Sequence, residues 1–405
     1  MLEVLTRKHY ADIVDSWLGK GNIIALVGSR RVGKSYVLKD FIQRHKEEGI
    51  NIIYIDKEKK AFNSIRTKFD LDAWIEERFI AGKHNCILID EIQEIDQFED
   101  SVCNWYTEEN TDVILTGSNS DMLSGELATR LSGRHVEVRI HPLTYAEFLQ
   151  FHALQDNDES LMTYLNYGGL PGLRKVGLEN DEQVWAYLMS VFNTIMLKDI
   201  IERHDIRNIP FLNNLIDFYA DTTGKLTSAN SISKYMKSQR EDISPNLILL
   251  YRGYYAEAFL LDVVQRYDIH GKRLFESNEK IYWDDLGLRN LRASGAMDSY
   301  MEKIIENAVY KHLRYLGYEV NVGVLNAGEV DFVCRKPGKT IYVQASYIIS
   351  EPSKRDREFG PLEKIRDNHP KYVISATPLL SQRDENGITH LSLREFLKEG
   401  FSRFA

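Results

Sequence analysis

The residues with the most recognisable chemistry form one run near the amino terminus, Gly28-Ser29-Arg30-Arg31-Val32-Gly33-Lys34-Ser35. This run fits G-x-x-x-x-G-K-[ST], the phosphate-binding P-loop pattern. Gly28 and Gly33 let the backbone turn tightly against a polyphosphate, and the loop N–H groups then point towards the anion. The Lys34 ammonium can reach the β- and γ-phosphates, and Ser35 can give its hydroxyl to Mg²⁺. We therefore expect residues 28–35, together with Tyr36, to bind ATP.

The segments around this loop have the order that a phosphate site requires. Residues 22–27 form a short apolar run, which is typical of a buried parallel strand. After the loop, apolar residues recur with helical spacing at 36–42. Strand, loop and helix in this order favour a P-loop over the alternative, a glycine turn that binds nothing.

A second pair of candidate residues, Asp90 and Glu91, ends the apolar run at 86–89. This is the form of a Walker B strand. Asp90 would hold Mg²⁺ through water, and Glu91 would orient or deprotonate the attacking water. Alone, an acidic turn after a strand would be the simpler explanation. The P-loop some 55 residues earlier favours the catalytic interpretation.

The next apolar strand is expected at 112–117 and delivers Ser118 and Asn119. Ligands bind at the carboxyl ends of strands in open α/β sheets, so either residue could contact the γ-phosphate or the attacking water. A plain strand exit explains each of them singly almost as well. Arg130 and Arg134 are candidates for a finger that spreads positive charge over the transferring phosphoryl group. The residues themselves favour Arg134 only slightly.

Composition limits the class of protein. The chain has 405 residues, which suggests roughly two to three domains, and a net charge of −9. That charge argues against coating nucleic acid or an anionic membrane, although a local basic patch stays open. No apolar run approaches ~18 residues and no signal peptide is recognisable, so we expect no membrane span. Cys86, Cys103 and Cys334 lack the spacing of a metal site and indicate thiols in a reducing cytoplasm.

Together the motifs resemble a family of prokaryotic AAA-type P-loop ATPases, described mostly as ATP-binding proteins with a C-terminal region of unknown function. The resemblance extends over the whole chain and rests on residues 27–35, 88–93, 115–118, 132–134, 142–149 and 167–171. It implies Mg²⁺-dependent ATP hydrolysis on an α/β fold. It also implies that Ser118 or Asn119 is the sensor and that Arg134 is the finger, presented to a neighbouring subunit. Ser35 replaces the commoner Thr and keeps the hydroxyl.

We expect four regions in this chain: a nucleotide domain at 1–150, a helical lid at 151–222, a winged-helix-like domain at 223–297 and a nuclease-like domain at 298–405. In the third region, helices are expected at 231–236 and 244–259 and wing strands at 260–267 and 273–282. Residues 225–275 hold eight basic and five acidic side chains, a balance of +3. This balance permits contact with DNA phosphates. An internal packing module with solvated charges is an equally open interpretation.

Residues 298–405 resemble a restriction-endonuclease-type α/β core, whose motif is an Asp, a gap, and then Glu-x-Lys on the next strand. Asp331 matches the Asp, and Glu306, or Glu302 one turn earlier, matches a helix carboxylate. Glu329 shares a strand face with Asp331. Gln344 stands where the Glu of Glu-x-Lys belongs.

Ser346 takes the place of the lysine in that motif. Fewer carboxylates weaken Mg²⁺ binding, and the missing lysine removes a cation beside the scissile phosphate. A lysine from the following helix, Lys354 or Lys364, could replace it. We expect a folded module that does not cut nucleic acid.

These expectations describe a cytoplasmic Mg²⁺-dependent ATPase that uses ATP to switch or drive an activity directed at nucleic acid or protein. It would be a homo-oligomer if Arg134 acts in trans. Two alternatives stay open. One is a winged-helix DNA-binding regulator with ATP as a slow switch, and the other is an ATP-gated nuclease.

Overall fold

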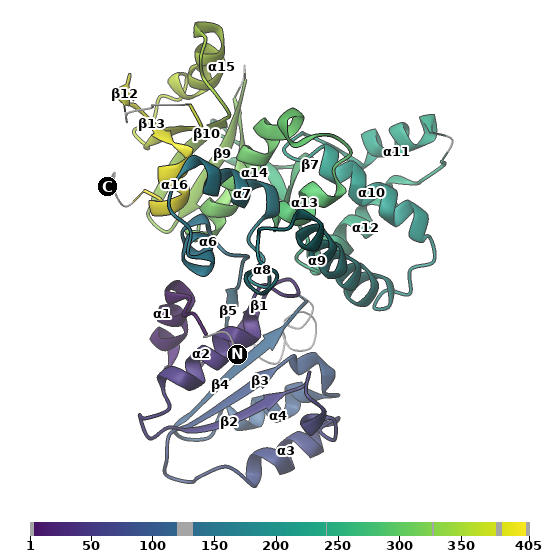
Figure 1. Ribbon diagram of the computed structural model, residues 1–405, viewed down its shortest axis with the longest axis vertical. Helices are drawn as coiled ribbons and strands as arrows, with labels where there is room; N and C mark the ends of the chain where they lie inside the picture. The colour runs from purple at the N-terminus through teal and green to yellow at the C-terminus, as the bar shows by residue number, and fades with distance from the viewer. Residues whose placement is uncertain (1–3, 120–132, 240, 326–327, 378–382, 402–405) are drawn as a thin grey trace. The chain divides into compact units, whose positions relative to one another are not determined.

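The computed structural model describes residues 4–119, 133–239, 241–325, 328–377 and 383–401 (Figure 1). The candidate Arg130 lies outside them. The chain forms two compact units: unit 1 is Met1–His141 with Glu257–Phe259, and unit 2 is Pro142–Ala256 with Leu260–Ala405. Unit 1 holds a parallel sheet and unit 2 a mixed sheet. The predicted α/β fold class is therefore confirmed.

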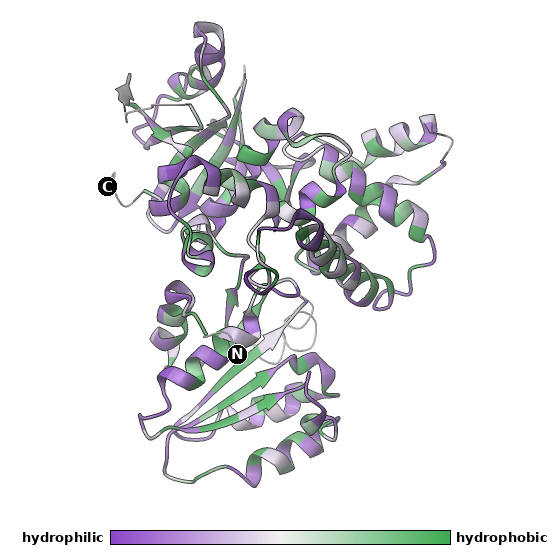
Figure 2. Ribbon diagram, in the orientation of Figure 1, coloured by the Kyte–Doolittle hydropathy of each residue, from purple (hydrophilic) through white to green (hydrophobic). Residues whose placement is uncertain are grey.

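Unit 1 is built on a five-stranded parallel sheet in the order β2-β3-β4-β1-β5. Its strands are β1 (Ile23–Val27), β2 (Asn51–Asp56), β3 (Asn85–Asp90), β4 (Thr111–Gly117) and β5 (His135–Arg139). Its helices are α1 (Lys8–Trp17), α2 (Lys34–Arg44), η1 (Lys60–Phe62), α3 (Lys68–Glu76), η2 (Ile92–Glu94) and α4 (Phe98–Trp105). The three central strands, β3, β4 and β1, are rich in apolar residues (Figure 2). These three strands are buried on both faces, as is usual in a parallel sheet.

The strand order decides which polar residues meet. Because all five strands are parallel, their carboxyl ends share one edge of the sheet. The P-loop follows β1, Asp90 ends β3, and Ser118 follows β4, so these groups gather at that edge. Arg134 precedes β5, whose first residue pairs with Ile23 at the start of β1. Arg134 therefore lies at the opposite, amino edge.

Unit 2 surrounds an eight-stranded mixed sheet in the order β12-β13-β11-β10-β9-β8-β6-β7. Its strands are β6 (Leu261–Asp268), β7 (Arg273–Trp283), β8 (Glu319–Leu325), β9 (Gly328–Lys336), β10 (Lys339–Ser346), β11 (Lys371–Ser375), β12 (Arg383–Glu385) and β13 (Ile388–Ser392). The strands β6 and β7 lie where the two wing strands were expected, and β6 pairs in parallel with β8. The expected boundary at residue 297 thus falls within one continuous sheet. The division into four domains stays a prediction.

Unit 2 also contains helices, and some of them pack on the same core as its sheet. The helices of unit 2 are α6 (Tyr145–His152), α7 (Asp158–Tyr167), α8 (Leu173–Val176), α9 (Asp181–Thr194), η4 (Ile195–Ile201), α10 (Ile209–Asp221), α11 (Ala229–Ser238), α12 (Pro245–Glu257), α13 (Leu286–Arg292), η5 (Met297–Tyr300), α14 (Met301–Tyr315), α15 (Pro352–Glu363) and α16 (Leu393–Glu399). One core cluster joins Phe148 of α6, Ile305 of α14, Phe332 of β9 and Phe396 of α16.

One helical stretch of unit 2, Asp181–Ile201, is long and apolar enough to cross a membrane by length and composition. Its most apolar window is 44% buried within the protein. Core helices of globular proteins pass the same test, so this single stretch is weak evidence for a span.

Two of the family-like motifs have structural explanations in unit 2. The run at 142–149 contains a capping box, in which Thr144 and Glu147 satisfy each other's backbone N–H groups at the start of α6. At 167–171, a Cβ on Gly168 would lie 2.4 Å from the carboxylate of Asp285. Gly169 donates its N–H to the same carboxylate at 2.8 Å. These contacts give both motifs a role in local structure and packing.

Candidate functional site

The P-loop backbone has positive φ angles at Gly28 and Gly33, which glycine adopts without strain. Gly28 and Gly33 have φ values of 145° and 104°, and Gly33 is the N-cap of α2. A Cβ on Gly28 would lie 2.3 Å from the carbonyl oxygen of Ile140, so only glycine fits there. Arg31 also has a positive φ, 67°, on the exposed side of the loop.

Lys34 is folded into this loop. Its side chain is 4% exposed, and Nζ donates to the carbonyl oxygens of Gly28 at 2.9 Å and Ser29 at 3.1 Å. Nζ also lies 4.0 Å from Oε1 of Glu91. The ammonium therefore stands between the loop and the Walker B strand, where it can exchange carbonyl contacts for phosphate oxygens.

Asp90 has the environment of a magnesium ligand. Its Oδ1 accepts hydrogen bonds from Ser35 at 3.1 Å and Thr116 at 2.6 Å. Its Oδ2 is buried and has no hydrogen-bond partner among the described residues. Burial raises the pKa of Asp90, and the bonds from Thr116 and Ser35 oppose that shift. An orphaned carboxylate oxygen beside the P-loop hydroxyl fits a hard divalent cation.

Thr116 is the functional residue that the sequence interpretation missed. Besides donating to Asp90, its Oγ1 accepts the backbone N–H of Glu91 at 2.9 Å. It is fully buried in the middle of the sheet. One hydroxyl thus fixes both Walker B residues. The sequence signals for Thr116 were a single hydroxyl within the apolar strand Val113-Ile114-Leu115-Thr116 and the family-like motif at 115–118 that contains it.

Glu91 is held in a strained conformation at the end of β3, with φ 57° and ψ 57°. Its Oε2 accepts a hydrogen bond from the side chain of Gln93. Ser118 and Asn119 are both 2% exposed at the same edge of the sheet. The sequence-predicted P-loop, Walker B and sensor residues are therefore brought together. Tyr36, at 43% exposure, lies at the surface of this region.

Arg134 is not brought to this site within one chain. It is exposed at the amino end of β5, and its guanidinium lies 5.9 Å from the centroid of the Tyr106 ring. Five residues of strand separate the two edges of the sheet, about 16 Å at 3.3 Å per residue. Any contact of Arg134 with a nucleotide would therefore involve another subunit's site.

The segment before β1 supports the P-loop from outside the motif. The buried Arg7 guanidinium donates to the carbonyl oxygens of Val32 at 3.2 Å and His141 at 2.8 Å. Tyr10 accepts the His141 N–H at 3.0 Å. Arg7 therefore links the loop to the segment after β5, and nothing in the sequence around Arg7 predicted this contact.

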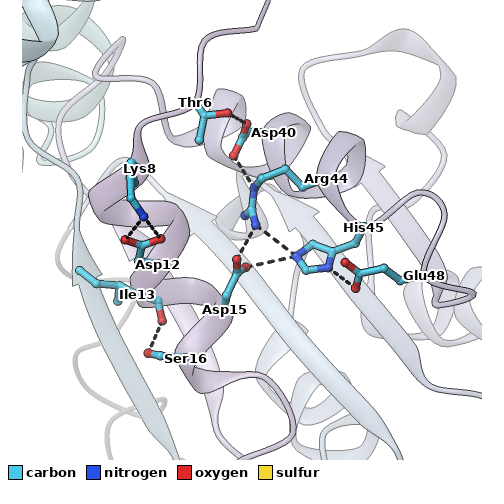
Figure 3. Close-up of polar contacts among 10 residues, drawn as sticks. All are labelled: Thr6, Lys8, Asp12, Ile13, Asp15, Ser16, Asp40, Arg44, His45 and Glu48. Atoms are coloured by element: carbon cyan, nitrogen blue, oxygen red, sulfur yellow. Dashed lines mark hydrogen bonds and ion pairs between the residues drawn. The ribbon is translucent and has the colours of Figure 1, made fainter.

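A polar network then ties α1 to the P-loop helix α2 (Figure 3). Arg44 of α2 donates to Asp40 at 2.8 Å and to Asp15 of α1. His45 also contacts Asp15, at 3.2 Å, and Thr6 donates to Asp40 at 2.5 Å. These contacts hold the helix that presents Lys34 and Ser35.

The nuclease-like region of unit 2 contains a cation that the sequence interpretation placed elsewhere. Lys280 of β7 has a side-chain exposure of only 4%. Its Nζ lies 2.9 Å from Glu306, 2.8 Å from Glu329 and 3.2 Å from Asp331. The sequence left open whether a lysine from elsewhere could replace the missing one, and Lys280 is the lysine that the structure brings to this cluster. Lys280 was overlooked because it precedes the motif, on a strand assigned to the wing.

Lys354 and Gln344, which were also considered for this cluster, contact residues other than Lys280. Lys354 pairs with Glu302 at 2.6 Å and does not take the place of the missing lysine. Gln344 accepts the backbone N–H of Asp331 at 3.2 Å and donates to Glu358 of α15 at 2.9 Å. The buried Glu358 is thus a carboxylate that the motif search did not include.

The charges of this cluster shift each other's pKa values. Burial alone would lower the pKa of Lys280, but Glu306, Asp331 and Glu329 raise it well above its ordinary value. Burial raises the pKa of Glu306 to about 7, although Lys280 opposes this shift. Tyr282 donates to Glu306 at 2.6 Å. Lys280 thus acts as a counter-ion at the point where three carboxylates converge.

Comparison with known proteins places these sites in context. Residues 20–149 match a family profile described as an AAA domain, and residues 158–299 match a domain of unknown function (DUF8612). An uncharacterised protein of Haemophilus influenzae is 33% identical over 382 residues, covering 92% of this chain and 93% of its own. An uncharacterised protein of Methanocaldococcus jannaschii is 28% identical over 361 residues, with coverages of 85% and 79%.

A solved structure supports the fold. The Walker-type ATPase PABY2304 of Pyrococcus abyssi is similar with a TM-score of 0.50, covering 71% of this chain and 95% of its own. Its sequence identity is 16%, so this likeness concerns the fold alone.

Proposed function

This chain belongs to the AAA-type P-loop ATPases, and we propose that it binds ATP with Mg²⁺ and hydrolyses it at the carboxyl edge of the unit 1 sheet. The observation that carries the proposal is the arrangement around Asp90. Ser35 and Thr116 bond one carboxylate oxygen and leave the other open beside the P-loop.

Each residue then has a definite task. Residues 28–36 bind the nucleotide, and Lys34 balances the charge of the β- and γ-phosphates. Ser35 and Asp90 hold Mg²⁺, which neutralises charge on the phosphates when bound. Glu91 orients the water that attacks the γ-phosphorus and accepts its proton, while the bond to ADP breaks. Ser118 or Asn119 senses the γ-phosphate.

The finer proposal concerns what ATP turnover does. We propose that nucleotide switches or drives an activity of unit 2 on nucleic acid or protein, in the cytoplasm. The basic balance of residues 225–275 supports DNA as a partner through the winged-helix-like region. The position of Arg134 supports a homo-oligomer in which it acts on a neighbouring subunit. The alternative is a DNA-binding regulator in which ATP is a bound switch that is turned over slowly, and DNA-stimulated ATPase activity would distinguish the two.

The test of the ATPase proposal uses two site variants and a surface control. Lys34→Ala should lose ATP binding, because the phosphates lose their cation. Glu91→Gln should bind ATP and lose turnover, because the water is no longer activated. Lys20→Ala, an exposed lysine near the amino edge of the sheet, should behave as wild type. Equal turnover by wild type and Glu91→Gln would refute the assignment.

A metal-dependent nuclease is the second candidate function, because Glu306, Asp331 and Lys280 bring together the acidic residues and the lysine that such a site uses. We nevertheless expect no cleavage of nucleic acid. The sequence suggested this because the lysine of Glu-x-Lys is missing, whereas the structure suggests it because of where Lys280 lies. The Lys280 ammonium occupies the point where Glu306, Glu329 and Asp331 converge. A lysine in the place of a metal ion leaves no Lewis acid to activate water.

Plasmid and single-stranded DNA incubated with Mg²⁺ or Mn²⁺, with and without ATP, test this expectation. The DNA should stay intact. Metal-dependent cleavage that disappears in Asp331→Asn would establish the nuclease instead. Cleavage that persists in that variant would point to a contaminating enzyme.

A further inference from the structure

Three potential metal ligands meet at the amino edge of the unit 1 sheet. His84 lies just before β3, Cys86 lies on β3, and Asp112 of β4 is the register partner of Cys86. His84 and Cys86 are two residues apart, so their side chains share a face of the strand. One nitrogen, one sulfur and one oxygen atom of this trio lie within 4.8 Å of one another. The tertiary structure therefore brings together a nitrogen, a sulfur and an oxygen ligand atom. The spacing of the cysteines in the sequence did not indicate this metal-binding arrangement.

The separations within the trio are close to those of a zinc site. His84 Nε2 is 2.6 Å from Asp112 Oδ2 and 3.9 Å from Cys86 Sγ. In a tetrahedral site, zinc bonds of about 2.0 Å to nitrogen or oxygen and about 2.3 Å to sulfur separate these atoms by about 3.3 and 3.5 Å. The two separations would change by about 0.7 and 0.4 Å, which small side-chain rotations supply.

The surroundings hold the donors and leave a path to them. The Asp112 carboxylate is buried and accepts the backbone N–H of Gly19 at 2.9 and 3.1 Å, which fixes its orientation. Such outer hydrogen bonds commonly position metal ligands. Cys86 is fully buried, whereas the side chain of His84 is 36% exposed. An ion can therefore enter past His84 and reach the sulfur without unfolding the sheet.

We propose that His84, Cys86 and Asp112 bind a zinc ion, with water in the fourth position. Imidazole, thiolate and carboxylate suit zinc, whereas magnesium prefers oxygen ligands alone. The Cys86 thiol proton is released to solvent as the zinc–sulfur bond forms. Four residues of β3 separate Cys86 from Asp90, about 13 Å, so this ion takes no part in ATP hydrolysis. Its effect is structural, because it joins β3, β4 and the turn at Gly19.

Cobalt provides the probe, because a cobalt–thiolate bond has a charge-transfer band in the near ultraviolet. Full-length, nucleotide-free protein is stripped with a chelator and titrated with Co²⁺. Wild type should develop the band with one equivalent, and Zn²⁺ should abolish it by displacement. Cys86→Ser should lack the band, while Cys103→Ser, a matched change of a half-buried cysteine in the same unit, should keep it. Cobalt at Asp90 would give no such band, because no thiol lies among its described contacts.

Cys86→Ser alters a buried strand, so His84→Gln provides a variant at a half-exposed position. It should fold normally and bind Co²⁺ at least tenfold more weakly, in line with the loss of a direct ligand. Zn²⁺ should raise the thermal unfolding midpoint of wild type and Cys103→Ser, and leave that of His84→Gln unchanged. Absence of the band in wild type, its persistence in Cys86→Ser, or its loss in Cys103→Ser would each overturn the zinc site. ATPase activity does not enter any of these readouts.

Discussion

Replacing Thr116 by valine isolates the hydroxyl that links the two Walker B residues. Valine keeps the branched shape in a fully buried position and removes two hydrogen bonds. One is donated to the Asp90 carboxylate at 2.6 Å, and the other is accepted from the Glu91 N–H at 2.9 Å. A bond to a charged group contributes ~1.5–3 kcal/mol, and an unsatisfied buried N–H costs ~1–3 kcal/mol. Because the two effects share one side chain, we expect Thr116→Val to lower the free energy of unfolding by about 2–4 kcal/mol.

The catalytic effect should exceed what this loss of stability explains. Without the Thr116 bond, which lowers the pKa of Asp90, that carboxyl is protonated more readily and holds Mg²⁺ less well. Loss of an outer-shell partner typically costs about 10–100-fold in metal affinity or activity. We expect Thr116→Val to need more Mg²⁺ for half-maximal turnover and to have a kcat about 10–100-fold lower.

Urea unfolding without nucleotide and ATPase rates across a Mg²⁺ titration measure these two effects. Thr116→Ser is the matched control, because it restores the hydroxyl and lacks only a methyl group. It should recover most of the turnover and of the Mg²⁺ dependence. Wild-type kcat and Mg²⁺ dependence in Thr116→Val would refute the role assigned to this hydroxyl. Equal losses in both variants would attribute the effect to packing.

Three further outcomes follow from the structure. If Arg134 acts on a neighbouring subunit, ATP turnover per subunit should rise with protein concentration. Mixing Arg134→Ala protein with Glu91→Gln protein should then restore some ATPase activity. Turnover that does not depend on protein concentration would contradict this role of Arg134. The pKa of Glu306 is about 7 in the folded protein and about 4.3 in an unfolded chain, so its contribution to stability is present below pH ~4 and is lost as pH rises to 7, by up to about 4 kcal/mol. The free energy of unfolding in urea should therefore change less between pH 5 and pH 8 in Glu306→Gln than in wild type. The same pH dependence in both proteins would contradict the raised pKa of Glu306. Lys280→Met should lower the free energy of unfolding by about 3–5 kcal/mol, because it leaves buried carboxylates without their cation; a variant as stable as wild type would show that the ion pairs contribute little.

The sequence by itself predicted the P-loop and the Walker B pair, because each of them is specified by a local pattern. The strand before the P-loop, the glycines and the helix after it are contiguous, so apolar run length and turn chemistry predict them together. β2 was expected at Asn51–Asp56 and is found there. The Walker B pair was recognisable for the same reason, as carboxylates that end an apolar strand. The general α/β class followed from these alternating elements.

Tertiary structure alone decided which side chains meet from distant parts of the chain. Lys280 reaches Asp331 across 51 residues, and Thr116 reaches Asp90 across 26. Each of these residues occupies an ordinary-looking position in a strand, and its function depends on the strand that pairs beside it. Strand order is set by the burial of whole apolar faces, which a local pattern does not encode. For the same reason His84, Cys86 and Asp112 carried no metal signature in sequence, and the register of β3 against β4 brought them together.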